Sequence, residues 1–216
     1  MYHKRPYLIG LERTRAGTYR DSSSGLFLDR NERSVAYNKE LIESLSRKMK
    51  DVPLNLYPEI YPLYKKLSDW LSFPENQIYV TEGVSGAIKS IIETLTFPGK
   101  HNIIFPYPTF ALYPVYCKMF NVEAKLVNYT NDYNLDVSHL VQLIDDQTAI
   151  VFLPNPNMPI EGAVSLNELE LIADQCNRHN VILAVDEVYY PFGGPSAIGL
   201  INRFDNVFVM RSFSKA

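Results

Sequence analysis

The chain has 216 residues, enough for one large domain or for a domain with part of another. Hydrophobic residues make up 46% and charged residues 21%, which is typical of a globular protein with a sizeable core, and the net charge of −3 gives no reason to expect nucleic acid or an anionic membrane as partner. The N-terminus is too polar for a secretory signal, and no apolar run approaches the length of a membrane span. Cys117 and Cys176 lack metal-ligand or CxxC spacing, so we interpret both as packing residues of a reducing compartment. A cytoplasmic protein is expected.

The first part of the chain differs in kind from the rest. Residues 1–25 are polar and weakly periodic, which indicates an arm, and residues 26–28 are expected to form a short strand. Apolar residues at helical spacing predict an amphipathic helix at 36–50, and a second helix is expected at 63–71. Three prolines in residues 53–62 predict an irregular loop between the two helices.

From residue 78 onward, short apolar runs alternate with helical patterns. The expected strands are 78–81, 102–105, 124–127, 149–153, 181–185 and 207–210. The expected helices are 85–96, 110–120, 138–143, 165–179 and a short piece at 197–203. Ser165 followed by Glu168 is the pattern of a capping box at the start of one of these helices. The alternation predicts an α/β fold with a mostly parallel sheet and helices on both faces.

Two residues that can carry chemistry follow the last two apolar runs. Asp186 ends one run and Lys215 lies just past the next, and ligands of open α/β sheets bind at the carboxyl ends of the strands. A lysine in such a place is a candidate Schiff-base former, because partial burial and positive neighbours lower its pKa. A buried acid one strand over can face the cationic nitrogen of a cofactor ring. By itself, however, Ser-x-Ser-Lys is a short pattern that more often marks a lysine on a solvated loop.

Three more turns stand at strand ends. Gly83-Val84-Ser85 opens a helix, where backbone N–H groups and the helix dipole can hold a phosphate. Phe110 stands at another helix start, although taken alone it reads as a core or surface phenylalanine. The stretch 154–162 holds three prolines and two asparagines, more than an ordinary surface turn needs.

Seven motifs in order make the chain resemble the first part of a fold-type I aminotransferase dependent on pyridoxal 5′-phosphate (PLP), of the class I/II group. Within that group it is most similar to histidinol-phosphate aminotransferases. The motifs are Asn31-Glu32, Tyr57-Pro58-Glu59, Gly83-Val84-Ser85, Pro108-Thr109-Phe110, Asn155-Pro156-Asn157-Met158-Pro159, Val185-Asp186-Glu187-Val188-Tyr189 and Ser212-Phe213-Ser214-Lys215-Ala216.

The resemblance covers nearly the whole chain and implies how it divides. Residues 1–50 would be an N-terminal arm with part of a small domain, and residues 51–216 would be the PLP-binding large domain. A complete family member continues past its lysine into a C-terminal small domain that supplies further arginines. We therefore expect the chain to be part of an enzyme with an incomplete site.

The resemblance also implies a role for each residue around the cofactor ring. Lys215 would hold PLP as a Schiff base and shuttle the substrate proton, and Asp186 would keep the pyridine nitrogen protonated. Tyr189 and Asn157 would bind the 3′-oxygen of the ring, and Phe110 would stack on it.

Other residues would surround the phosphate and the substrate. The phosphate would contact Val84, Ser85, Ser212 and Ser214. Tyr57 would reach a phosphate in the neighbouring subunit, which implies a homodimer with shared active sites. Asn31 and Glu32 would lie near the substrate.

Departures from the family pattern leave several points open. Residues 157–162 contain one residue too many before the glycine, so Asn157 is the favoured partner of the 3′-oxygen and Asn155 stays an alternative. The phosphate turn and the residues beside Asn31 also differ, which leaves the substrate open between histidinol phosphate and a related amino acid or amino phosphate, with a 2-oxo acid as the second substrate. One alternative function is a PLP decarboxylase similar to threonine-phosphate decarboxylase. Another, of a different class, is a non-catalytic PLP-binding regulatory domain. No metal is expected.

Overall fold

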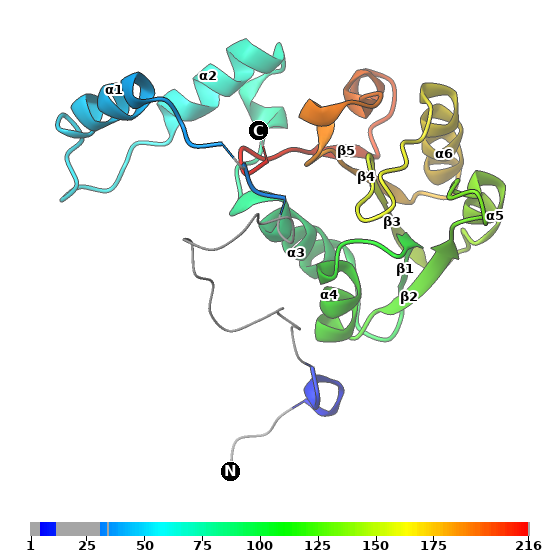
Figure 1. Cartoon of the computed structure of the whole chain (residues 1–216). Coiled ribbons are helices and arrows are strands. Elements are labelled where there is room, and N and C mark those ends of the chain that lie inside the picture. The colour runs from blue at the N-terminus through cyan, green and yellow to red at the C-terminus, as the bar shows by residue number, and fades with distance from the viewer. Residues whose placement is uncertain (1–4, 12–30, 34, 216) are drawn as a thin grey trace. The chain divides into compact units, whose positions relative to one another are not determined.

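The computed structural model describes residues 5–11, 31–33 and 35–215 (Figure 1). Its contacts group the chain into two compact units. The larger unit takes in the described residues of Met1–Asp21 and Glu82–Ala216, and the smaller takes in those of Ser22–Thr81. The expected strand at 26–28 lies outside the described residues. The expected domain division after residue 50 differs from this grouping of contacts and stays a prediction.

The larger unit is built on a five-stranded parallel sheet. Its strands are β1 (Asn102–Tyr107), β2 (Glu123–Asn128), β3 (Thr148–Pro154), β4 (Ile182–Asp186) and β5 (Val207–Met210). They lie in the order β2-β1-β3-β4-β5, and every neighbouring pair is parallel. The predicted α/β class with a parallel sheet is confirmed, and so are five of the six predicted strands.

Helices cover both faces of the sheet. They are α3 (Gly83–Leu95), α4 (Leu112–Phe120), α5 (Val137–Gln142) and α6 (Leu166–Arg178), with the short 3-10 helix η4 (Ala197–Asn202). The unit also contains the 3-10 helices η1 (Pro6–Leu8) and η3 (Tyr190–Phe192). Figure 1 shows α3 and α4 on one face and α5 and α6 on the other. The predicted helices of this unit are confirmed, with ends that agree within two residues.

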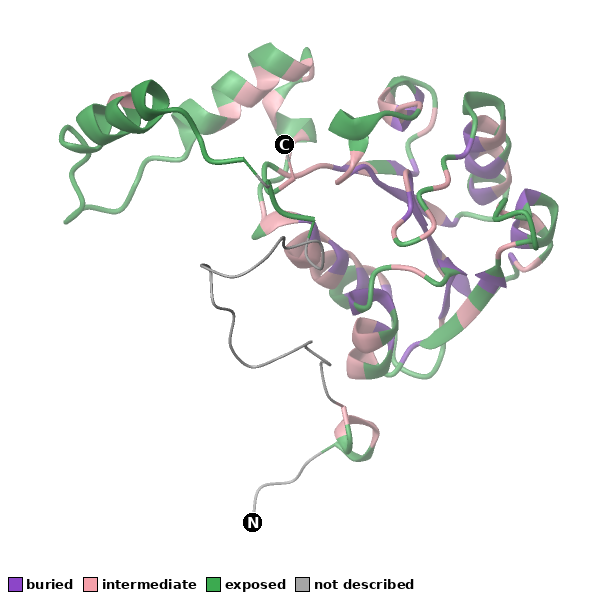
Figure 2. Ribbon diagram, in the orientation of Figure 1, coloured by how far each residue is buried: buried purple, intermediate pink, exposed green. Residues whose placement is uncertain are grey.

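Alternation along the strands divides the core into two layers, one on each face. Successive strand side chains point to opposite faces. Ile103, Phe105 and Phe152 accordingly join the cluster under α3 and α4, whereas Ile104 and Val151 join the cluster under α5, α6 and η4. All five side chains are fully buried, and Figure 2 shows the buried residues concentrated along the strands and the inner sides of the helices. A sheet covered on both faces requires such continuous apolar strands.

Both cysteines are packing residues, as predicted. Cys117 of α4 is 2% exposed and Cys176 of α6 is fully buried, and neither forms a disulfide. Burial raises the pKa of each thiol to about 12. A thiol that keeps its proton at neutral pH is a poor nucleophile, so both side chains act through their volume.

One predicted strand, 78–81, is wrong. Ile78 has an extended backbone, with φ −111° and ψ 133°, but no strand within the described ranges pairs with this segment. The backbone N–H of Val80 instead donates to the Tyr64 hydroxyl at 3.1 Å. A β-strand is defined by ladder bonds to a neighbour as well as by its apolar run, and the apolar pattern alone could not reveal which partner the backbone takes.

The smaller unit holds two helices and little core. Its helices are α1 (Lys39–Met49) and α2 (Tyr61–Leu71), followed by the 3-10 helix η2 (Glu75–Gln77), and both predicted α-helices are confirmed with shifted ends. None of the described residues of this unit is buried. The predicted apolar face of α1 is present but exposed, with Leu45 at 50% and Met49 at 54%.

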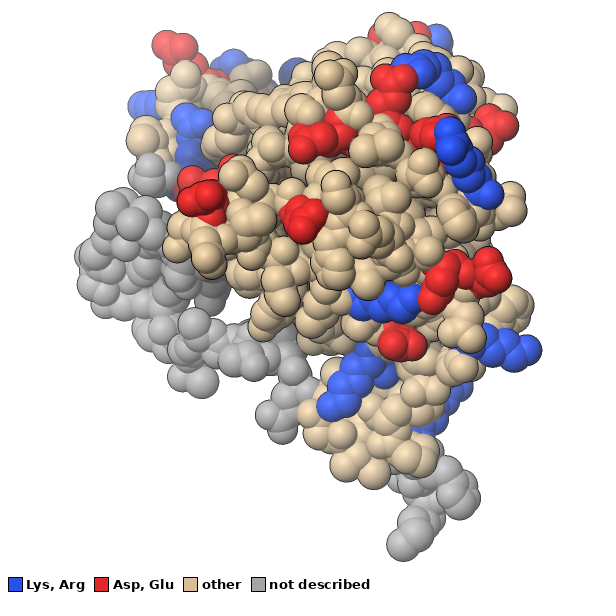
Figure 3. All heavy atoms as spheres, turned by 90° about the vertical axis from the view of Figure 1, so that its right-hand side faces the viewer, with Lys and Arg blue, Asp and Glu red and all other residues tan. Residues whose placement is uncertain are grey.

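Charged side chains on the α5 and α6 side of the larger unit are of mixed sign (Figure 3). Arg178 pairs with Asp174 at 2.8 Å, and Arg203 pairs with Glu170. Exposed pairs of this kind contribute little to stability, so the surface tolerates change better than the two core layers do. Within the described ranges, no helix combines the length and the apolar character needed to cross a membrane.

The start of α6 gives a stability prediction. Ser165 accepts a hydrogen bond from the Glu168 N–H, and the Glu168 carboxylate accepts one from the Ser165 N–H at 2.9 Å. Ser165→Ala removes the cap and should lower the free energy of unfolding by about 1 kcal/mol, measured by urea unfolding. Ser138→Ala, at an exposed serine of α5, is the matched control and should change it by less than about 0.5 kcal/mol. Equal effects would show that the capping box does not stabilise α6.

Candidate active site

Asp186 is the buried acid at the carboxyl edge of the sheet. It ends β4 and is 2% exposed. It lies two residues after Ala184 and therefore faces the same side of the sheet, toward α4. There Tyr113 of α4 donates its hydroxyl proton to Oδ2 at 2.7 Å, and the Val188 N–H donates to Oδ1 at 3.1 Å. Burial raises the pKa of Asp186 to about 6, and these two hydrogen bonds oppose that rise.

Phe110 lies on the same side of the sheet as Asp186. Its ring is 39% exposed and meets the Tyr113 ring edge-on, with 6.4 Å between the centroids. Phe110 and Asp186 are thus joined through one residue, Tyr113. The predicted stacking residue and the predicted acid lie on the same side of the sheet, with an aromatic surface still open to a ligand.

Asn157 is held by the turn that leads to Phe110. Its amide oxygen accepts from the Thr109 hydroxyl at 2.7 Å, and its amide nitrogen donates to the Pro108 carbonyl at 2.9 Å and to the Tyr129 hydroxyl at 2.7 Å. The Pro108 carbonyl can only accept, which fixes which end of the amide is nitrogen. Both amide protons are therefore donated within the chain.

Asn155, the alternative, points away from this cluster. It is 1% exposed, its oxygen accepts from the Val164 N–H at 2.7 Å, and its nitrogen donates to the Pro195 carbonyl at 3.0 Å. Its backbone N–H donates to the Asp186 carbonyl at 2.8 Å. The Asn155 side chain thus ties the loop after β3 to residues 164 and 195.

A candidate anion site lies where α3 begins. Gly83 has φ +69°, a conformation that glycine adopts readily, and a Cβ built there would lie 3.6 Å from the Ser212 Oγ. The N-cap residue Glu82 makes no side-chain cap hydrogen bond. The Val84 side chain is buried in the core, so it is the backbone of Val84 and Ser85 that can face a ligand.

The two predicted serines after β5 lie next to each other. The Ser212 and Ser214 hydroxyls form a hydrogen bond, with 2.9 Å between their Oγ atoms, and the Ser214 N–H donates to the Ser212 Oγ at 3.1 Å. Together with Gly83, they gather hydroxyls and a helix N-terminus in one place. Such a place suits a phosphate.

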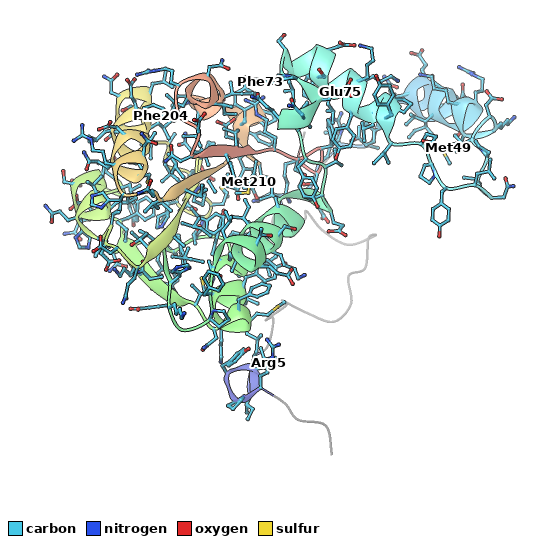
Figure 4. All side chains as sticks on the ribbon, turned by 180° about the vertical axis from the view of Figure 1, so that it is seen from behind. Arg5, Met49, Phe73, Glu75, Phe204 and Met210 are labelled. Atoms are coloured by element: carbon cyan, nitrogen blue, oxygen red, sulfur yellow. The ribbon has the colours of Figure 1, made fainter. Side chains whose placement is uncertain are left out.

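A buried ion pair connects the ends of β4 and β5. Glu187 follows Asp186 and faces the opposite side of the sheet, where its carboxylate accepts from Ser196, from the Ala197 N–H at 2.6 Å and from the Arg211 Nε at 3.0 Å. The Glu187 side chain is fully buried. Its N–H donates to the carbonyl of Met210, which Figure 4 labels at the end of β5. The segment that leads to Ser212 is thereby fixed against β4.

The remaining predicted residues lie at the same edge or in the other unit. Lys215 is partly buried, five residues after β5 ends, and Tyr189 is partly buried beside Phe192, with 6.3 Å between their ring centroids. Asn31, Glu32 and Tyr57 belong to the smaller unit, so their part in the site stays a prediction. Ala216, the last residue of the lysine motif, lies outside the described residues.

Tyr113 is the main residue that the sequence interpretation missed. It lies three residues after Phe110, in the first turn of α4. A tyrosine within an apolar helical face needs a hydrogen-bond partner for its hydroxyl, and this signal could have pointed to a buried acid. Thr109, Tyr129 and Arg211 were missed as well, because their partners are distant in sequence.

The residues present fit PLP. Burial makes the Asp186 carboxyl group reluctant to ionise, and a cationic ring nitrogen would stabilise its ionised form. Phe110 offers an aromatic face. The α3 start with Ser212 suits a phosphate, and Lys215 supplies an amine. Across the described ranges, no group of three or more His, Cys, Asp or Glu side chains could hold a metal ion.

Comparisons with known proteins agree with this arrangement. The family described as aminotransferase class I and II matches residues 26–216. A histidinol-phosphate aminotransferase of Thermoanaerobacter pseudethanolicus is 34% identical over 196 residues, which are 88% of this chain and 54% of that protein. The same enzyme of Syntrophus aciditrophicus is 33% identical over 180 residues, 81% of this chain and 49% of that protein. The chain therefore spans about half the length of the curated relatives it matches.

Solved structures show the same fold. The putative histidinol-phosphate aminotransferase of Erwinia carotovora atroseptica superposes with a TM-score of 0.79 at 22% identity, covering 93% of this chain and 59% of that one. Cystalysin of Treponema denticola, whose structure contains a pyridoxal 5′-phosphate cofactor, gives 0.76 at 20% identity and covers 86% and 51%.

The burial of Asp186 gives a pH-dependent prediction. An aspartate in the unfolded chain titrates near pH ~4, whereas Asp186 in the folded chain has a pKa of about 6. Between these values the folded state holds more protons, so the free energy of unfolding should fall as pH rises from ~4 to ~6. Asp186→Asn cannot titrate and should lack this fall, which corresponds to on the order of 3 kcal/mol.

Urea unfolding of the cofactor-free protein at a series of pH values measures the effect. Asp132→Asn, at an exposed loop position, makes the same change of charge and should keep the wild-type pH dependence. A wild-type pH dependence in Asp186→Asn would contradict the burial described here.

Proposed function

Because the chain belongs to the aminotransferase class I and II family, we propose that it forms the PLP-binding part of an enzyme that transfers an amino group between a small amino compound and a 2-oxo acid. One observation carries the proposal. Asp186, the acid expected to face the cofactor ring, lies buried at the carboxyl edge of a parallel sheet and is joined through Tyr113 to the open ring of Phe110. The proposal concerns the whole protein that contains this chain.

The residues around the cofactor ring have distinct roles in this proposal. When bound, PLP supplies an electrophilic aldehyde and a ring that accepts electrons. The Lys215 amine would hold the cofactor at its aldehyde group and would move a proton at the substrate α-carbon. The Asp186 carboxylate would hold the proton of the ring nitrogen in place, and the Phe110 ring would exclude water from one side.

The 3′-oxygen and the phosphate take the other groups. Tyr189 and Asn157 are the proposed partners of the 3′-oxygen. Asn157 would give up its hydrogen bond to the Tyr129 hydroxyl and donate to the 3′-oxygen instead. The phosphate goes to the Val84 and Ser85 N–H groups and to the Ser212 and Ser214 hydroxyls, because a helix N-terminus stabilises an anion.

For the substrate, we propose histidinol phosphate or a related amino acid or amino phosphate, with Asn31 and Glu32 beside it. The relatives that match over most of this chain carry the name histidinol-phosphate aminotransferase. We also place the protein in the cytoplasm, where two buried free thiols stay reduced.

We propose a homodimer with shared sites because of Tyr57. Its side chain is 100% exposed in a proline-flanked loop of the smaller unit. A tyrosine gains little from full contact with water, whereas its amphipathic ring suits an interface. A phosphate bound by the partner subunit would satisfy its hydroxyl.

The first test of the function is where the cofactor attaches. Purified full-length protein should bind PLP, and borohydride reduction with mass mapping should place the pyridoxyl group on Lys215. Lys215→Ala should lose at least about a hundredfold of amino transfer from histidinol phosphate to 2-oxoglutarate, since it removes both the attachment point and the proton carrier. Lys89→Ala, at a solvent-facing lysine of α3, is the matched control and should keep both properties.

The outcomes separate the candidate functions. A pyridoxyl group on Lys89 or Lys118 would contradict the site. Release of CO2 without amino transfer would identify a decarboxylase, and PLP on Lys215 without turnover of any amino compound would identify a regulatory domain.

The dimer has its own test. Tyr57→Phe should weaken PLP binding about tenfold without unfolding the protein, because a hydrogen bond to a charged phosphate is lost; Tyr61→Phe, at a tyrosine 62% exposed, should not. In heterodimers of Tyr57→Phe with Lys215→Ala, one site has an intact lysine beside the other chain's Tyr57. Equilibrium dialysis should show that PLP affinity recovers at this site. No recovery would mean that Tyr57 acts within its own subunit or not at all.

A further inference from the structure

Tyr113 and Asp186 form a buried, hydrogen-bonded pair between α4 and the end of β4. The tyrosine side chain has 0% exposure, and its hydroxyl lies 2.7 Å from the Asp186 Oδ2. The ring is stacked on Phe105 at 5.6 Å and packs against Phe152 at 5.1 Å between centroids. Three neighbouring side chains thus fix the direction of one hydroxyl.

The hydroxyl acts only as a donor to this carboxylate. Burial, and then the charge of Asp186, raises the pKa of Tyr113 well above its usual value, so the hydroxyl keeps its proton. The carboxylate receives Tyr113 on Oδ2 and the Val188 N–H on Oδ1. Each oxygen therefore has one donor, and the carboxyl group cannot rotate without losing both.

We propose that Tyr113 is a positioning residue for the PLP site, an inference that rests on the proposed function: its hydroxyl holds Asp186 in one orientation and favours the ionised carboxylate that can pair with a cationic ring nitrogen. A carboxyl group that kept its own proton would face an unprotonated ring nitrogen instead. A ring in that state draws electrons from the substrate less strongly.

The charged groups around Asp186 also influence how readily it ionises. Glu187 is its neighbour in the chain and makes Asp186 harder to ionise, but its own charge is paired with Arg211 on the far side of the sheet. Lys215 follows β5 at the same edge. Tyr113 is the group whose hydroxyl can be removed while these charges stay unchanged.

The test is the pH dependence of the unfolding free energy of the cofactor-free protein, in wild type and in Tyr113→Phe. In wild type, stability should fall with rising pH until Asp186 is ionised. Loss of the donor raises the folded pKa further, so in the variant the fall should continue to a pH about one unit higher. Lost packing alone would lower stability by the same amount at every pH.

Two controls isolate the pair. Tyr116→Phe, at a partly buried tyrosine one turn further along α4, should leave the pH profile unchanged. In an Asp186→Asn background, Tyr113→Phe should no longer shift the profile, because the titrating group is gone.

A pH-independent loss of stability, or an equal shift in the Asp186→Asn background, would overturn the proposal. If Tyr113→Phe does not fold, 3-fluorotyrosine at position 113 keeps the ring and donates a stronger hydrogen bond, and the end of the fall should move to lower pH. No movement would likewise overturn it. Because the protein carries no cofactor in these measurements, their failure is distinguishable from a failure of the proposed function, which the labelling of Lys215 tests separately.

Discussion

The buried carboxylate of Asp186 is the constraint on which the site depends. Burying an acid is costly unless its charge is compensated, and here the carboxylate accepts hydrogen bonds from two neutral donors, the Tyr113 hydroxyl and the Val188 N–H. Its pKa of about 6 leaves it poised near neutral pH. A cationic ring nitrogen would stabilise the ionised form. A cationic ligand would therefore offset the free-energy cost of burying this carboxyl group.

The two adjacent acids at the end of β4 face opposite sides of the sheet and have different roles, because successive side chains of an extended chain alternate. Asp186 faces α4 and the candidate cofactor, whereas Glu187 faces η4 and pairs with Arg211. Removing one partner of a buried ion pair is strongly destabilising. The Glu187–Arg211 pair thus gives the β5 end, and with it the segment toward Ser212, a fixed place against β4.

Much of this could be predicted from the sequence. Apolar runs predicted five strands and their parallel direction, because continuous apolar strands alternating with helices leave few other folds. Asp186, Phe110 and Ser212 were predicted at strand ends and lie there in the structure. The strand predicted at 78–81 was wrong because an apolar run is a property of the segment alone, whereas a β-strand also needs a neighbouring strand to pair with its backbone. Tyr113 and the Asn157 network were missed because their contacts, to Asp186 and to Thr109 and Tyr129, join residues far apart in the chain.

The central claim is that Asp186 serves the ring nitrogen of PLP. The most direct measurement is the nitrogen NMR signal of PLP labelled with 15N in the ring and bound to the full-length protein. The account predicts the chemical shift of a protonated ring nitrogen at neutral pH, with a large change when Asp186 is replaced by Asn. A ring nitrogen that is unprotonated in the wild-type protein, or whose signal does not respond to Asp186→Asn, would contradict it.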